Sequence, residues 1–138
     1  MNFDNWTDGK SYEYVIHIHN GRKSGLHFDI RINNDKNHLY DFATRKNPTL
    51  NNNETILLFQ QKDHSKEWLN IEVDEKKSKE QNIDMFLIFD KGVVKIISND
   101  IERVIISFMG DKMKGCFSII PYRKYQYLFM KIPYKNCK

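Results

Sequence analysis

The sequence predicts a single-domain, mainly β protein whose strands form an antiparallel barrel or sandwich. Short apolar and aromatic runs recur along the chain, and many alternate with polar residues at the two-residue period of a strand. Gly, Asp and Asn turns separate these runs at the even spacing typical of all-β architectures. The 138 residues, 40% of them hydrophobic, are enough for one core and too few for two.

The first two strands are the clearest elements. Residues 12–19 alternate between two faces and end at Asn20-Gly21, a turn signal, and residues 26–32 alternate in the same way. An aromatic run follows the polar loop at residues 33–37. The complete set of expected strands is 12–19, 26–32, 38–43, 55–61, 68–73, 85–89, 93–97, 104–109, 116–121 and 127–132. Residues 74–81, rich in Lys and Glu, predict a helical or disordered insert with a solvated face.

Composition and charge limit the expected partners and cellular location of the protein. The formal net charge of +4 suits a polyanionic partner without requiring one. Cys116 and Cys137 lack a Cys-x-x-Cys spacing and predict free thiols in a reducing compartment. The N-terminus has no basic segment followed by an apolar run, and no stretch approaches the length of a membrane span. We therefore expect a cytoplasmic protein, or a nuclear one in a eukaryote, that is not secreted and has no membrane partner.

The strand at residues 26–32 carries the most chemistry. Side chains change faces at every residue of a strand, so His27, Asp29 and Arg31 share one face, opposite the apolar face. An imidazole, a carboxylate and a guanidinium thus lie close together, and Arg31 offers a planar fork suited to phosphate oxygens. This face predicts a site for a metal and a phosphate.

Other histidines complete the candidate metal site. His19 ends the preceding strand, so a hairpin brings it near His27 and Asp29, and His64 follows Asp63 at the end of a later strand. Mixed nitrogen and oxygen ligands suit manganese, zinc or iron, and ligand type alone does not choose among them. His17 and His38 are expected to be structural residues satisfied within the sheet.

These residues carry a family resemblance. His19 followed by Leu26-His27-Phe28-Asp29-Ile30-Arg31 resembles the His…Leu-His-Tyr-Asp-Phe-Arg signature of the 3'-phosphoesterase domain of bacterial DNA ligase D, which also occurs as a free-standing protein. Later landmarks follow in the family's order. Residues 42–49 are similar to its Trp-Ala-Val-Pro-Lys-Gly-Pro-Ser segment, 62–64 to Glu-Asp-His, 89–92 to Trp-Asp-Arg-Gly, 110–117 to Gly-x-Lys-Leu-x-Gly-x-Trp and 127–131 to Trp-x-Leu-x-Lys.

The resemblance implies a compact β-barrel and a manganese-dependent hydrolase that trims nucleic acid 3' ends during DNA repair and end joining. Family members remove a 3'-terminal ribonucleotide and then the 3'-phosphate. Carried over by position, His19, Asp29 and His64 would bind Mn²⁺, while His27 and Arg31 would be catalytic and contact the scissile phosphate together with Lys46. The expected partners are primer 3' ends of DNA or RNA and a separate DNA ligase, and the expected state is a monomer.

The chain also departs from the family pattern. Trp68, the third residue expected to be catalytic, stands where the family has an active-site tyrosine, and an indole cannot replace a phenol oxygen as acceptor or acid. Two extra residues separate His19 from His27, so the loop at 20–25 is expected to bulge outward. Residues 73–83 replace a glycine-rich loop, and residues 1–11 form a shortened N-terminal arm within the single domain 1–138.

Two other classes of function stay open. A cupin-like metal-binding barrel would act on a small molecule, as His17-Ile18-His19 suggests, but it assigns Arg31 no role. A catalytically silent nucleic-acid-binding barrel would use exposed aromatic and basic side chains to stack bases and neutralise phosphates. Its candidate residues are Tyr122, Arg123, Lys124, Tyr125 and Tyr127.

Overall fold

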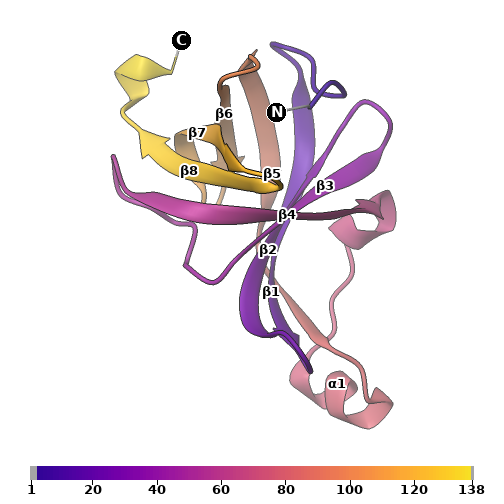
Figure 1. The fold of residues 1–138 in the computed structure, drawn as a ribbon. Coiled ribbons are helices and arrows are strands. Elements are labelled where there is room, and N and C mark those ends of the chain that lie inside the picture. Colours follow the sequence, from indigo (N-terminus) through magenta and orange to yellow (C-terminus); the bar gives the residue numbers. More distant parts are fainter. Residues whose placement is uncertain (1–2, 138) are drawn as a thin grey trace.

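Eight antiparallel strands close into one barrel, as the family resemblance implies (Figure 1). The computed structural model describes residues 3–137. The strands are β1 (Ser11–Gly21), β2 (Gly25–Asn33), β3 (His38–Thr44), β4 (Thr55–Ser65), β5 (Met85–Asn99), β6 (Val104–Gly110), β7 (Lys114–Arg123) and β8 (Gln126–Ile132). They run around the barrel in the order β1-β2-β3-β4-β8-β7-β6-β5, and β5 pairs with β1 to close it. The domain is mainly β, and the barrel has no free sheet edge.

The segment between β4 and β5 differs in part from the sequence prediction. The strand expected at 68–73 is wrong: a 3-10 helix, η1 (Lys66–Leu69), occupies its start, and a single bridge joins Val73 to Phe86. The insert at 74–81, expected to be either helical or disordered, is helical and forms α1 (Glu75–Gln81). The helix begins after Asp74, whose carboxylate accepts a hydrogen bond from the Lys77 amide. The segments at 85–89 and 93–97 form one long strand, β5.

The barrel interior is filled by large side chains that alternate along the strands. Tyr14, Phe108 and Phe117 make edge-to-face contacts in sequence, and Phe117 stacks on Phe129 with ring centroids 4.7 Å apart. From the N-terminal arm, Phe3 and Trp6 are also buried in this cluster. On β2 the interior positions are Phe28, Ile30 and Ile32, so the intervening His27, Asp29 and Arg31 face outward.

Two of the resembling landmarks contact each other and stabilise the fold. The buried Asp90 carboxylate accepts from the Tyr14 hydroxyl and from the backbone amides of residues 111–113 in the β6–β7 turn. A side chain at Gly110 would collide with both Tyr14 and Asp90, so glycine is required there. These landmarks therefore have a structural role here, with Asp90 holding the turn against β5.

The prediction of free thiols is wrong. Cys116 in β7 and Cys137 form a disulfide, with their Cα atoms 5.8 Å apart. The reason lies in the sheet register, since Cys116 pairs with Ile132 of β8. The short 3-10 helix η2 (Tyr134–Asn136) then turns the chain back. The two cysteines are 21 residues apart in sequence, but the β7–β8 hairpin brings them together.

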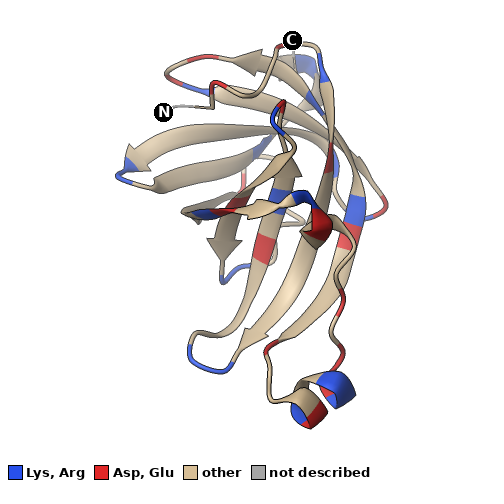
Figure 2. Ribbon diagram, turned by 90° about the vertical axis from the view of Figure 1, so that its right-hand side faces the viewer, with Lys and Arg blue, Asp and Glu red and all other residues tan. Residues whose placement is uncertain are grey.

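Charged positions are spread over the molecule (Figure 2). Lys and Arg lie at several separate turns and strands, and helix α1 carries both signs of charge. Over residues 3–137, no helix has the length and apolarity needed to cross a bilayer. The +4 net charge by itself thus marks no single binding face, and a polyanion site has to be located from local geometry.

Candidate metal and anion site

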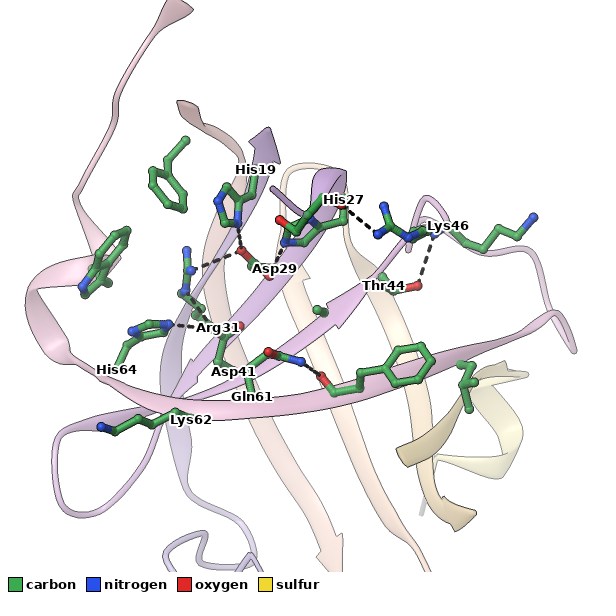
Figure 3. Close-up of a pocket in the computed structure, with 17 residues that line it drawn as sticks. His19, His27, Asp29, Arg31, Asp41, Thr44, Lys46, Gln61, Lys62 and His64 are labelled. Carbon is green, nitrogen blue, oxygen red and sulfur yellow. Dashed lines mark hydrogen bonds and ion pairs between the residues drawn. The ribbon is translucent and has the colours of Figure 1, made fainter. Parts of the chain in front are cut away.

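The predicted site residues gather on the outer face of the wall formed by β1 to β4 (Figure 3). His27, Asp29 and Arg31 share one face of β2, opposite the interior cluster, as their alternation predicts. Aromatic side chains of the β4–β5 segment and of β5, Trp68 and Phe86, cover part of this face. Arg31 is only 2% exposed for this reason, although it lies outside the core. Asp29, in contact with His19, His27 and Arg31, is equally buried.

Three side chains converge as potential metal ligands. One ligand atom from each of His19, His27 and Asp29 lies within 4.8 Å of the other two. His19 and His27 are direct register partners on β1 and β2, and their rings lie 4.4 Å apart. The expected outward bulge of the 20–25 loop is wrong: both strands run on to the Gly21–Gly25 pair, and the longer hairpin keeps the histidines opposite each other.

Both histidines are anchored through the ring nitrogen that faces away from this convergence point. His27 Nδ1 donates to the Gly25 carbonyl at 3.2 Å, and its Nε2 lies 3.2 Å from Asp29 Oδ1. His19 Nε2 donates to Asp84 Oδ2 at 2.9 Å, and its Nδ1 lies 2.9 Å from Asp29 Oδ2. A carbonyl or carboxylate on the remote nitrogen is the usual outer support of a metal-bound histidine. The donor set and its supports therefore fit a divalent transition metal.

The electrostatics of the group agree with a cation site. Burial opposes protonation of His19, but its hydrogen bonds with Asp29 and Asp84 outweigh burial and raise the pKa of the imidazole. Burial also opposes ionisation of Asp29, yet the hydrogen bond from His19 and the charge of Arg31 hold the pKa of that carboxyl below its usual value. Asp29 is thus ionised at neutral pH and attracts positive charge to this position.

Arg31 is fixed from several sides beside the histidine group. Its Nη1 donates to His17 Nδ1 at 2.6 Å and its Nη2 donates to Asp29 Oδ2 at 3.2 Å. The guanidinium carbon lies 4.8 Å from the Trp68 ring centre and 5.6 Å from that of Phe86. Since both hydrogen bonds and aromatic rings hold the guanidinium, its positive charge has a fixed position in the pocket lining.

His17 is a satisfied sheet residue, as expected, and it also supports Arg31. Its Nε2 donates to the Ile71 carbonyl at 2.7 Å, which leaves Nδ1 as the acceptor for Arg31. Burial lowers the pKa of His17 to about 4, so the ring is neutral at pH 7 and can accept that hydrogen bond. His38, the other histidine expected to be structural, is exposed at the start of β3.

The structure places His64 with a different partner from the one predicted. The converging group contains His27 in place of His64, so two of the three predicted metal ligands come together and the third does not. His64 Nε2 instead lies 2.8 Å from Asp41 Oδ2, and Asp41 is buried, with Arg31 Nε 3.5 Å from the same oxygen. His64, Asp41 and Arg31 form an adjoining arrangement that faces the pocket.

A β-bulge explains how His64 reaches this position. Leu39 pairs with His64 and Asp41 pairs with Gln61, so β4 has one residue more than β3 between these two pairs. Strict alternation would put Asp63, and not His64, on the face of Gln61. The extra residue reverses the alternation and turns His64 toward Asp41.

Two further predicted residues line the pocket, which has a volume of about 840 Å³. Trp68 is half-buried and packs against His64 and Phe86, with ring centres 5.2 and 4.9 Å away. It forms a wall over Arg31. Lys46 and Lys62 lie at opposite ends of the pocket (Figure 3).

Sequence reasoning missed Asp41 and Asp84. Asp41 had a usable signal, because it interrupts the aromatic run of β3 on the face opposite Tyr40 and Phe42. Asp84 had none: it follows helix α1 as an ordinary surface acid and meets His19 only through the 65-residue connection that folds back onto the hairpin.

Comparison with known proteins identifies no family. No protein-family model matches the chain, and the search of curated proteins returned no match.

Proposed function

We propose that this protein is a manganese-dependent 3'-phosphoesterase that acts on nucleic acid 3' ends in DNA repair. The proposal rests on the ordered series of resembling motifs and on one structural observation that supports it. A group of potential metal ligands, His19, His27 and Asp29, adjoins a buried, fixed arginine in a pocket open to solvent. A Lewis acid and a fixed cation near the phosphoryl oxygens both stabilise the negative charge that develops during phosphate ester hydrolysis.

Each residue has a distinct role in this proposal. His19, His27 and Asp29 would hold Mn²⁺, which would supply a Lewis acid and a water molecule of lowered pKa. Arg31 would stabilise negative charge that develops on the phosphoryl oxygens, since its position is fixed before substrate binds. His64, whose Nε2 is held by Asp41, would orient a phosphate oxygen or transfer a proton to the leaving group.

Trp68 and Lys46 keep supporting roles. Trp68 packs over the Arg31 guanidinium and excludes water from one side of it. It has no hydroxyl to offer, so we expect one of the two reactions to be less efficient in this chain. Lys46, at the pocket edge, would attract the strand electrostatically.

A direct assay tests the proposal. Purified protein with Mn²⁺ should convert a primer-template bearing a 3'-phosphate to a 3'-hydroxyl end, and His19→Ala or Asp29→Ala should abolish the conversion. His38→Ala is the matched control, because it removes an exposed histidine outside the pocket and should leave the rate unchanged. A 3'-ribonucleotide substrate measures the second reaction in parallel. Binding without turnover, with steep salt dependence, would instead indicate the silent nucleic-acid-binding class.

The structure gives no separate support to a cupin-like small-molecule enzyme. The barrel interior is packed with aromatic and aliphatic side chains, and the histidines lie on the outer wall. The same assay with a simple phosphomonoester and no nucleic acid would show whether a small molecule is preferred.

A further inference from the structure

The pocket extends well beyond the metal and anion group. At about 840 Å³ it is much larger than a metal ion with a single phosphate, and part of its lining comes from the apolar side chains of Ala43, Leu57 and Phe59. We propose that Phe59 is a stacking platform for the base of the 3'-terminal nucleotide, so that the site selects nucleic acid over other phosphate esters. This inference rests on the proposed phosphoesterase function and deepens it.

The sheet register places Phe59 at a suitable distance from the phosphate site. Asp29 pairs with Ala43, and Ala43 pairs with Phe59, so the three residues form one row across β2, β3 and β4. Two strand spacings separate Asp29 from Phe59, a distance of about 10 Å. This is comparable to the span from a nucleotide's phosphate to its base. Ala43 lies between them, and its single methyl group leaves space in the pocket above it.

The exposure of Phe59 is also unusual for its place in the fold. Its neighbour Leu58 is buried in the barrel interior, whereas Phe59 faces outward from the middle of a paired strand and is 41% exposed. No aromatic ring of residues 3–137 stacks on it. An open aromatic face in a pocket is the feature that single-stranded nucleic acid binders use to hold bases of any sequence.

Charges around the platform favour a nucleotide over an apolar ligand. Lys46, Lys62 and Arg45 line the same pocket. On the other side of Phe59, its register partner is Gln126 of β8, next to the β7–β8 turn where Arg123 and Lys124 lie over the rings of Tyr122 and Tyr125. An aromatic surface flanked by cations on both sides matches a base joined to a phosphate backbone.

Kinetic comparison of two substrates tests this proposal. One is an oligonucleotide with a 3'-phosphate on a normal terminal nucleotide, and the other has an abasic terminal nucleotide with the same phosphate. We expect the wild type with Mn²⁺ to prefer the base-bearing substrate in kcat/KM by roughly 5- to 150-fold, the range that stacking of one base on an aromatic ring supports. Phe59→Ala should remove most of this preference, by lowering kcat/KM on the base-bearing substrate toward its value on the abasic one.

Two variants serve as controls in that comparison. Phe59→Tyr retains a ring and should retain the preference. Tyr134→Ala removes an aromatic side chain that is 81% exposed outside the pocket, and it should behave as the wild type. A Phe59→Ala protein that still prefers the base-bearing substrate to the wild-type extent would overturn the proposal.

A binding measurement separates failure of this inference from failure of the proposed function. The probe is a reaction product, an oligonucleotide that ends in 2-aminopurine with a 3'-hydroxyl, whose fluorescence is quenched when the base stacks. Saturable quenching by the wild type and Tyr134→Ala, lost in Phe59→Ala, supports the platform even if no substrate is hydrolysed. Absence of quenching by the wild type, or equal quenching by Phe59→Ala, contradicts it.

Discussion

Asp84 is not one of the three potential metal ligands, but removal of its carboxylate should still weaken metal binding. Asp84 accepts from His19 Nε2 at 2.9 Å and from the Arg22 backbone amide at 3.0 Å. Asp84 thereby fixes the His19 ring so that Nδ1 faces Asp29, and its negative charge makes the imidazole a more basic ligand for a metal. The hydrogen bond from His19 also lowers the pKa of Asp84 itself, so this carboxylate is ionised at neutral pH.

The expected magnitude follows from this outer support. Loss of such a partner typically weakens metal affinity by about 10- to 100-fold, or about 1.4 to 2.8 kcal/mol. We expect Asp84→Ala to reach this range. Asp84→Asn should cost less, because its amide oxygen can still accept from His19. The melting temperature without metal should fall by only a few degrees in either variant, since the Asp84 side chain is 34% exposed.

Isothermal titration with Mn²⁺ measures the effect. Glu102→Gln is the control, because it removes an exposed carboxylate that does not line the pocket. If Asp84→Ala binds Mn²⁺ as tightly as the wild type, the inferred support of His19 is refuted. If the wild type itself binds no Mn²⁺, the metal site is refuted.

Four further outcomes are expected. Arg31→Met should lower the free energy of unfolding by about 3 to 5 kcal/mol in urea titrations, because it leaves two buried carboxylates without their cation; a loss below about 1 kcal/mol would contradict this. Leu58→Ala, in the fully packed interior, should cost about 2 to 5 kcal/mol in the same assay, and a smaller loss would indicate a looser core. The hydrogen bond from Lys10 lowers the pKa of Asp35 from 3.8 to about 2. The stability that this pair provides is therefore present above pH 3.8 and is lost as the pH falls through about 2. Asp35→Asn should make the melting temperature vary less with pH across that interval, and an unchanged acid dependence would argue against the pair. Orthophosphate should bind, by calorimetry, only when Mn²⁺ is present, and equal binding in EDTA would refute the coupling of the two sites.

Local patterning was sufficient to predict most of the fold and half of the site. The alternation of residues 26–32 correctly put His27, Asp29 and Arg31 on one face, and the turn at Asn20-Gly21 correctly brought His19 opposite His27. These contacts lie within one hairpin, so strand period and turn chemistry determine them.

The remaining part of the site depends on non-local geometry. His64 reaches the pocket through a bulge that no Gly or Pro in residues 61–65 announces, and the bulge decides which face the histidine takes. The same holds for the disulfide between Cys116 and Cys137, which depends on the β7–β8 register and on a turn after β8. Sequence alone does not specify such irregularities, because they are set by the closure of the whole barrel.

The charge balance of the site explains why metal and phosphate binding are expected to be coupled. Asp29 and Asp41 lie on either side of Arg31, so with neutral histidines two carboxylates face one guanidinium. Burial raises the pKa of Asp41, but protonation of that carboxyl would bring the group only to neutrality. A phosphate that approaches these three side chains without the metal therefore meets little net attraction from them, despite Arg31. A divalent cation at His19, His27 and Asp29 makes the group positive in either protonation state of Asp41. Arg31 and the metal would then both attract the phosphate. We therefore expect the acidic residues of this group to weaken anion binding when no divalent cation is bound.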